Sequence, residues 1–179
     1  YWLSMHTDVQ LAVVFADVVG STQLYDRLGE EYARELIAST LDLMREATVL
    51  HRGSVVKTMG DEIMSTFAEP SDAIAAAARM QRLVGTIHET SGVSARVALR
   101  IGCHFGPVVL EARDIFGATV HTANRMTSQA KAGQIMTTAA TNGLKIKRMK
   151  KKERRNQLKN PGMISRALFA LIPSPFFRP

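Results

Sequence analysis

Two aspartates that follow short apolar segments are the first residues in this sequence that suggest chemistry. Asp17 comes directly after residues 11–16, a valine-rich apolar run that predicts a buried strand. Asp61 lies with Gly60 in a turn between two short segments that predict a β-hairpin. If the hairpin pairs beside the first strand, both carboxylates meet at one end of a sheet. Because Mg²⁺ prefers carboxylate and phosphate oxygens, we expect two Mg²⁺ (or Mn²⁺) ions there, an arrangement suited to displacement at phosphorus.

The segment that joins the first strand to the next helix predicts an anion site. Backbone N–H groups at a helix start lack intrahelical acceptors, and the helix dipole also favours negative charge. We therefore expect a phosphate to bind the N–H groups of this turn. The residues concerned are Val18, Val19, Gly20, Ser21 and Thr22.

The order of the remaining predicted elements defines the fold class. Helical spacing of apolar residues predicts helices over 23–28, 30–50, 73–88 and 117–130, and alternation or apolar content predicts strands over 97–105, 108–110 and 134–137. We expect Gly106 and Pro107 to break the first of these strands and to begin a hairpin. The order predicts an α+β fold, a ferredoxin-like split βαβ sandwich with a largely antiparallel sheet and helices packed on it.

Four blocks of this sequence together resemble the catalytic domain of the class III adenylate and guanylate cyclases. The blocks occur in the family's order and at its spacing. They are residues 15–22, 57–62, 100–108 and 114–126. The resemblance divides the chain into a linker (1–9), a nucleotide cyclase catalytic domain (10–143) and a tail that does not match the family (144–179).

The resemblance implies a reaction and roles for further residues. The 3′-oxygen of a nucleoside triphosphate would attack its own α-phosphorus, which gives a 3′,5′-cyclic nucleotide and pyrophosphate. Asp17 and Asp61 would hold both metal ions, with the carbonyl of Val18 as a further ligand. Arg125 matches the arginine that stabilises charge on the α-phosphate. His121 stands where the family usually has an asparagine that orients the ribose.

Lys57 and Asp114 match the pair that selects the base in adenylate cyclases of this family. Adenine offers an amino donor at N6, which suits a carboxylate, and an acceptor at N1, which suits an ammonium group. Guanine reverses these two groups, and guanylate cyclases of the family have Glu and a small residue at these positions. The pair therefore favours ATP as substrate.

The resemblance also implies partners. In this family one subunit supplies the metal aspartates and the other supplies the residues equivalent to His121 and Arg125, so we expect a homodimer with shared sites. Because the chain does not begin with Met, we expect it to be part of a longer protein in which a sensor or membrane domain precedes the cyclase domain. The lone Cys103 fits a reducing compartment, and we expect a cytoplasmic domain.

Charge is divided unevenly along the chain. Residues 144–179 carry 11 Lys and Arg and one acid, whereas residues 1–143 carry 12 Lys and Arg and 15 acids. The tail therefore accounts for the net charge of +7. Such a tail is either a solvated extension or a segment that contacts an anionic surface such as nucleic acid or lipid.

Two other function classes remain open on the sequence alone. A degenerate cyclase domain could act as a nucleotide- or partner-binding regulatory module, which His121 and the unmatched tail favour. A diguanylate cyclase is suggested by the partial match of residues 59–63 to that family's acidic turn, but the block 114–126 has no counterpart there. A guanylate cyclase is disfavoured by Lys57 and Asp114.

Overall fold

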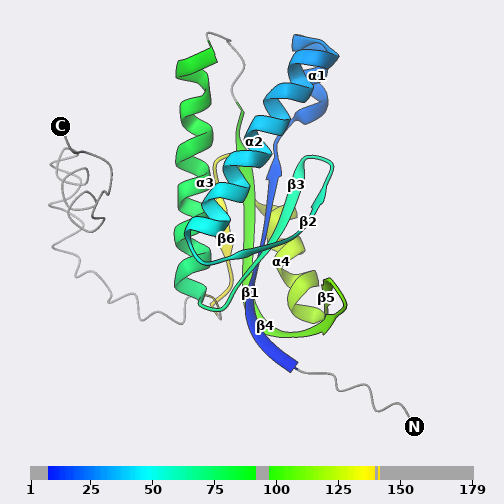
Figure 1. Ribbon diagram of the computed structural model, residues 1–179, viewed down its shortest axis with the longest axis vertical. Helices are drawn as coiled ribbons and strands as arrows, with labels where there is room; N and C mark the ends of the chain where they lie inside the picture. Colours follow the sequence, from blue (N-terminus) through cyan, green and yellow to red (C-terminus); the bar gives the residue numbers. More distant parts are fainter. Residues whose placement is uncertain (1–7, 92–96, 140, 142–179) are drawn as a thin grey trace, which may run out of the picture. The chain divides into compact units, whose positions relative to one another are not determined.

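One mixed sheet organises the part of the chain that the computed structural model describes, residues 8–91, 97–139 and 141 (Figure 1). Its strands are β1 (Asp8–Val18), β2 (Ser54–Met59), β3 (Glu62–Phe67), β4 (Leu99–Glu111), β5 (Asp114–Phe116) and β6 (Ile135–Thr137). The helices are α1 (Ser21–Leu28), α2 (Glu30–Leu50), α3 (Pro70–Ser91) and α4 (Ala118–Gln129). The strand order is β2-β3-β1-β4-β5, and β6 also pairs with β4.

The central strand β1 is antiparallel to both of its neighbours, β3 and β4. The hairpins β2–β3 and β4–β5 are antiparallel as well, whereas β6 runs parallel to β4. The first four strands and the helices between them reproduce the order β–α–β–β–α–β of a split βαβ fold. The predicted fold class, α+β with an antiparallel-rich sheet, is confirmed.

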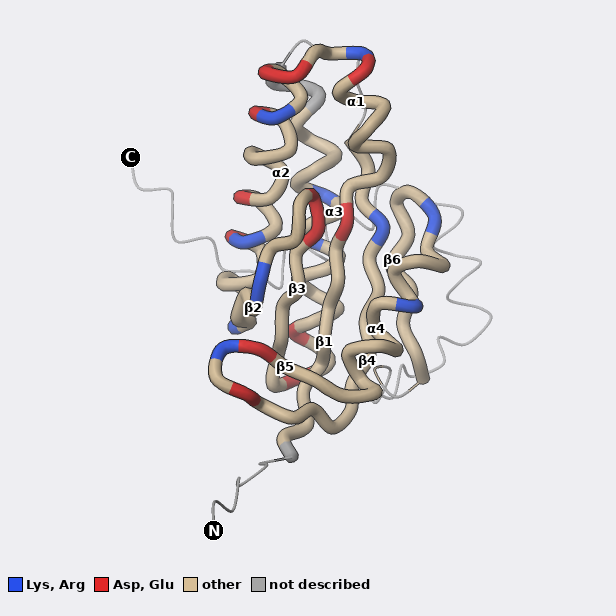
Figure 2. The backbone as a smooth tube through the Cα atoms, turned by 90° about the vertical axis from the view of Figure 1, so that its right-hand side faces the viewer, with Lys and Arg blue, Asp and Glu red and all other residues tan. Residues whose placement is uncertain are grey.

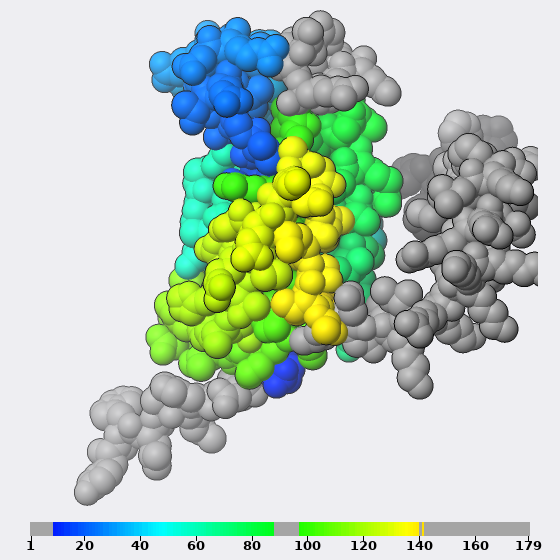
Figure 3. All heavy atoms as spheres, turned by 180° about the vertical axis from the view of Figure 1, so that it is seen from behind, coloured from blue at the N-terminus to red at the C-terminus, as the bar shows by residue number. Residues whose placement is uncertain are grey.

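The two faces of β1 pack against different helices because successive side chains of a strand alternate. Val14 and Ala16 belong to a core cluster that includes residues of α2 and α3. Phe15 belongs to a second cluster with Ala123 of α4. Figure 3 shows α4 and the segment that follows it spread over the side of the molecule opposite to the view of Figure 1. By alternation, Asp17 belongs to the face that α4 covers.

One sequence prediction about the strands was wrong. β4 continues through Gly106 and Pro107 instead of breaking there, and its hairpin partner β5 begins only at Asp114. Pro107 lies opposite Gln10 of β1, between the segments of β4 that pair with β6 and with β5. A strand flanked on one side only can hold a proline without losing a ladder hydrogen bond on the open side.

The predicted helices are present with small changes at their ends. α2 spans Glu30–Leu50 as predicted, and Gly29 separates it from α1 in a backbone conformation with φ of 81° that favours glycine. α1 begins earlier than predicted, at Ser21, so it starts directly after the turn at Gly20. α3 extends over Pro70–Ser91, which is longer than predicted at both ends.

Several predictions concern segments outside the described residues. These are most of the N-terminal linker and the whole of the basic tail, so the boundaries 1–9, 10–143 and 144–179 remain predictions. Among the helices that the structure describes, none combines the length and apolar character needed to cross a membrane.

We expect Gly102→Ala to destabilise the fold because α4 packs directly on this glycine. A Cβ atom at residue 102 would lie 2.5 Å from the carbonyl oxygen of Ala123 and still closer to the backbone of Thr127. Overpacking of this kind costs about 1–3 kcal/mol of unfolding free energy, measurable by urea denaturation. Gly85→Ala in α3 is the matched control, since nothing lies within 4 Å of its added Cβ. Equal stability of the two variants would contradict this packing.

Candidate active site

The sheet brings the two predicted metal aspartates to the same end of β1. Asp17 lies opposite Glu62 in the pairing of β1 with β3, and Asp61 immediately precedes Glu62 in the β2–β3 turn. The N–H of Val18 donates to the carbonyl oxygen of Asp61 at 3.3 Å, which fixes the turn against the strand. Figure 2 shows the acidic turn before β3 beside the acidic end of β1.

Arg100 joins this acidic end from the other side. It lies opposite Asp17 in the pairing of β1 with β4, and its Nε donates to Oδ2 of Asp17 at 2.5 Å. The Asp17 side chain is 11% exposed and the Arg100 side chain 42% exposed. Arg100 lies in the family block 100–108, but no role was predicted for it. The signal was available, because an antiparallel neighbour of β1 must place some residue across from Asp17.

Burial, and to a lesser extent the neighbouring carboxylates, raises the pKa of two acidic groups at this end of the sheet. Burial raises the pKa of Asp17, the hydrogen bond from Arg100 opposes that rise, and the charge of Asp61 adds to it. Burial also raises the pKa of Glu62 to about 7, with a further contribution from Asp17. A site with surplus negative charge favours a bound cation.

Asp17 and Asp61 bring carboxylate oxygens that could hold a metal ion to this end of the sheet. The described residues contain no group of three or more His, Cys, Asp or Glu arranged to hold an ion. Mg²⁺ typically takes one or two carboxylates and completes its shell with substrate phosphates and water. Asp17 and Asp61 are two such carboxylates.

The predicted base-selecting pair is in direct contact. Nζ of Lys57 on β2 and Oδ2 of Asp114 on β5 are 2.6 Å apart, although β2 and β5 stand at opposite ends of the strand order. The sheet must therefore curl strongly to bring its two edges together. The hydrogen bond from Lys57 lowers the pKa of Asp114, and the N–H of Ile115 contributes through a 2.8 Å bond to Oδ1. Both side chains stay partly exposed, at 40% and 31%, so a ligand can reach them.

The start of α1 offers fewer amides than the sequence suggested. The N–H of Val18 already donates to Asp61, and the N–H of Val19 donates to the carbonyl oxygen of Ala98 at 2.8 Å. These two amides are therefore engaged in holding the turn. Gly20 precedes α1 with φ of 71°, and the amides that remain at the helix start are those of Gly20, Ser21 and Thr22.

His121 and Arg125 lie on the outer face of α4. Thr119, Ala123 and Thr127 bury the inner face, whereas His121 and Arg125 are exposed. The two exposed residues are four positions apart and share a helix face, as predicted. Within the described part of the chain, no recorded side-chain contact joins either of them to Asp17 or Asp61.

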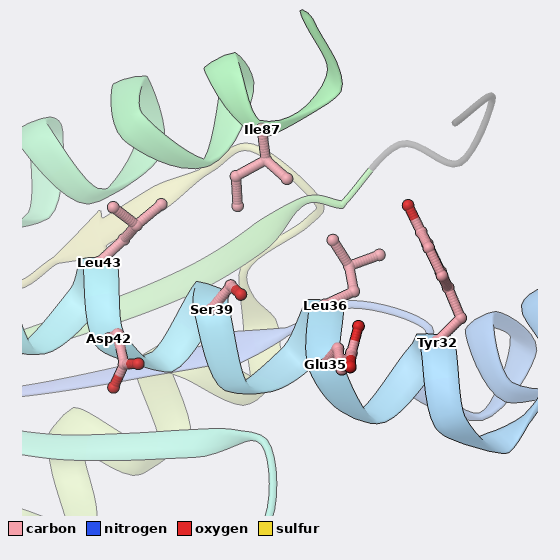
Figure 4. Close-up of a pocket in the computed structure, with 7 residues that line it drawn as sticks. All are labelled: Tyr32, Glu35, Leu36, Ser39, Asp42, Leu43 and Ile87. Carbon is pink, nitrogen blue, oxygen red and sulfur yellow. The ribbon is translucent and has the colours of Figure 1, made fainter. Parts of the chain in front are cut away.

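One of the cavities beside α2 touches the predicted site. A cavity of about 370 Å³ is lined by residues of α1, α2 and the β2–β3 turn, among them Ser21, Gly60 and Asp61. Another, of about 490 Å³, lies between α2 and α3, where Ile87 points towards α2 (Figure 4). None of the predicted site residues lines the second cavity. Proximity to Asp61 therefore makes the first cavity the more relevant one.

Comparison with known proteins identifies the family. Residues 3–171 match the model of the adenylate and guanylate cyclase catalytic domain, a range that extends into the segment 144–179. The chain belongs to this family, and the predicted resemblance is confirmed.

Curated relatives and solved structures agree with this assignment. The chain is 35% identical over 133 residues to an adenylate cyclase of Streptomyces coelicolor and 37% identical over 128 residues to one of Streptomyces griseus. These alignments cover 74% and 72% of this chain but only 33% and 31% of the relatives. The chain thus spans about a third of the length of these proteins.

Two solved structures have the same fold. The adenylyl cyclase CyaB from P. aeruginosa superimposes with a TM-score of 0.68 at 24% identity, covering 75% of this chain and 79% of that one. The monomeric guanylyl cyclase domain of RhoGC from Blastocladiella emersonii gives a TM-score of 0.69 at 21% identity, with coverages of 76% and 85%. The likeness concerns the fold and does not distinguish the two substrates.

The raised pKa of Glu62 predicts that the stability of the metal-free protein depends on pH. Its pKa of about 7 lies above the ordinary 4.5, so the carboxyl favours folding while it is protonated. This contribution is complete below about pH 4.5 and is lost as the pH rises through about 7.

We therefore expect Glu62→Gln to be more stable than the wild type at pH 8, by about 1–2 kcal/mol after allowing for the partial exposure of the carboxyl. At pH 4.5 the two proteins should be nearly equal. Urea denaturation in EDTA at both pH values measures this difference. Glu111→Gln, at an exposed residue of β4, reports the effect of losing one negative charge by itself. A Glu62→Gln gain that is the same at both pH values would contradict the raised pKa.

Proposed function

We propose that this domain is an adenylate cyclase that converts ATP to 3′,5′-cyclic AMP and pyrophosphate in intracellular signalling. The observation that carries the choice of ATP is the 2.6 Å contact between Lys57 and Asp114, which come from opposite ends of the strand order. The family assignment supports the reaction class, and the acidic end of β1 supports metal-assisted chemistry.

Adenine recognition follows from the chemistry of this pair. Asp114 accepts a hydrogen bond from the N6 amino group, and Lys57 donates to N1. Adenine would replace the bond that the two side chains make with each other, so the free pair already has the charges that the base requires. Guanine would present its acceptor to the carboxylate and its donor to the ammonium group, and both contacts would be unfavourable.

Asp17 and Asp61 would hold two Mg²⁺ (or Mn²⁺) ions, with the carbonyl of Val18 as a further ligand. When bound, the ions neutralise the triphosphate and acidify the ribose 3′-hydroxyl. The amides at the start of α1 would bind phosphate oxygens, which supports a fixed position of the triphosphate. Of the five residues predicted for this role, Gly20, Ser21 and Thr22 retain suitable amides.

Arg125 and His121 would complete the site from a second copy of the chain. Arg125 would donate to the α-phosphate, where charge develops during the attack, and a guanidinium suits this because its charge is permanent and its donors are forked. His121 would contact the ribose in place of the usual asparagine. Their exposure on the outer face of α4 supports a role across an interface. The resulting homodimer has two shared sites, and the monomer is inactive.

The cellular setting is also a proposal. We place the domain in the cytoplasm, where ATP is available, as one part of a longer protein in which a sensor or membrane domain controls dimer geometry. The basic tail would contact an anionic surface and thereby orient the domain.

Complementation tests the shared site directly. We expect Asp17→Ala and Arg125→Ala each to abolish cyclic AMP formation, because each removes one half of both sites. An equimolar mixture should recover about a quarter of the wild-type rate, since half of the dimers are mixed and each has one intact site. Cyclic AMP production with ATP and Mn²⁺ measures this.

Asp17→Ala mixed with Asp61→Ala is the control, because both changes lie in the same half of the site and no rescue should follow. Failure of the folded wild type to form any cyclic nucleotide, with partner or nucleotide binding unaffected by Asp17→Ala, would favour a regulatory binding module instead.

Base selection has its own test. We expect Lys57→Glu combined with Asp114→Cys to lower kcat/KM for ATP relative to GTP by at least about tenfold, because a site built for one set of donors leaves groups unpaired with the other. Steady-state kinetics with both nucleotides measures the ratio. Lys131→Gln, at an exposed lysine after α4, controls for the net loss of one positive charge. An unchanged ratio would mean that the pair does not read the base.

A further inference from the structure

Arg100 is the one cation in direct contact with the acidic end of β1 among the described residues. Its Nε lies 2.5 Å from Oδ2 of Asp17, and the cross-strand pairing of β1 with β4 fixes the two residues opposite each other. The contact is therefore set by the register of two central strands, and a chance encounter of two surface side chains does not explain it.

The surroundings of this contact make Asp17 depend on a cation. The Asp17 side chain is 11% exposed, so water satisfies little of its charge. Asp61 and Glu62 are close enough for their charges to act on Asp17 and on each other. A buried carboxylate among like charges needs a positive partner, and removing that partner is costly.

A divalent ion bound to Asp17 would compete with the Arg100 guanidinium for the same carboxylate. The guanidinium is permanently charged and uses a lone pair of Oδ2 that a metal ion would otherwise take. The Arg100 side chain is 42% exposed, so solvent is available to it if it leaves. A divalent ion and the guanidinium would also repel each other if both were in contact with the Asp17 carboxylate.

We infer that Arg100 is the resident cation of the metal-free centre and that the first divalent ion must displace it from Asp17. Arg100 thereby stabilises the empty site and weakens metal binding in the absence of nucleotide. This inference rests on the proposed metal site at Asp17 and Asp61, and it adds a positioning residue that sets the occupancy of that site.

Metal binding without nucleotide tests the inference independently of catalysis. Mn²⁺ affinity is measured by calorimetry and by electron paramagnetic resonance of free Mn²⁺, on the whole chain at constant ionic strength. We expect Arg100→Gln to bind Mn²⁺ about tenfold more tightly than the wild type, because one charge-assisted competitor is lost. Asp17→Asn should lose the site.

Arg34→Gln is the matched control for the loss of a positive charge. Arg34 lines the cavity that contains Asp61, but it pairs with Glu30 at 3.0 Å and has no recorded bond to Asp17. We expect its Mn²⁺ affinity to change less than twofold. An effect equal to that of Arg100→Gln would reduce the result to general electrostatics and overturn the specific role.

Thermal unfolding gives a second readout. In EDTA, Arg100→Gln should melt at a lower temperature than the wild type, and Mn²⁺ should raise its melting temperature by more. If Arg100→Gln does not fold, Arg100→Lys keeps the charge with fewer and less rigid donors, and its Mn²⁺ affinity should rise about two- to threefold.

The outcomes separate the two claims. Mn²⁺ binding by the wild type with equal or weaker binding by Arg100→Gln would overturn the displacement and leave the proposed metal site standing, with Arg100 and the ion sharing Asp17 through different oxygens. No Mn²⁺ binding by the wild type or by either Arg100 variant without nucleotide would overturn the inference. The proposed mechanism, in which substrate phosphates complete the metal shell, would then be tested by the Mn²⁺ dependence of cyclic AMP formation.

Discussion

The placement of a carboxylate at the buried end of a central strand is the constraint on which this structure depends. β1 has strands on both sides, so Asp17 cannot turn away to solvent as it could on an edge strand. The same pairing that buries it brings Glu62 from β3 and Arg100 from β4 to its sides. Hydrophobic burial along β1 thus provides the energy that holds opposed charges at the sheet end. The acidic centre is therefore coupled to the core, and its geometry follows from strand register.

The sheet also determines where the other predicted site residues lie. Some are at its two edges, on β2 and β5, and others are on α4. Curling brings β2 and β5 together, and the contact of Lys57 with Asp114 lies where they meet. Because Gly102 has no side chain, α4 can pack closely on β4. Its exposed residues, His121 and Arg125, lie on the face of α4 turned away from the sheet, which agrees with the proposal that a second copy of the chain completes the site.

Much of this arrangement could be predicted from the sequence, and the exceptions have physical causes. The hairpin around Asp61 and the apolar run before Asp17 are local patterns, and the fold places them as expected. The meeting of Lys57 with Asp114 came only from the resemblance, because no local pattern reports the curl of a sheet. The contact of Arg100 with Asp17 was not predicted, because the sequence shows that some residue of the neighbouring strand must face Asp17 but does not give the cross-strand register that selects Arg100. The predicted break at Pro107 was wrong because a proline beside an unpaired edge does not end a strand.

The β2–β3 hairpin has a consequence for how such a domain can change. Lys57, Asp61 and Glu62 lie within six consecutive residues of this hairpin, on either side of one tight turn at Gly60. A tilt of the hairpin would displace Lys57, which we propose reads the base, and Asp61, which we propose holds the metal, by the same motion. A movement that changes the position of the base-binding group would therefore also change the position of the metal ligand. An insertion in the hairpin, or a regulatory contact with it, would change base selection and metal position together. Side-chain substitutions on an unchanged backbone would alter the two properties separately.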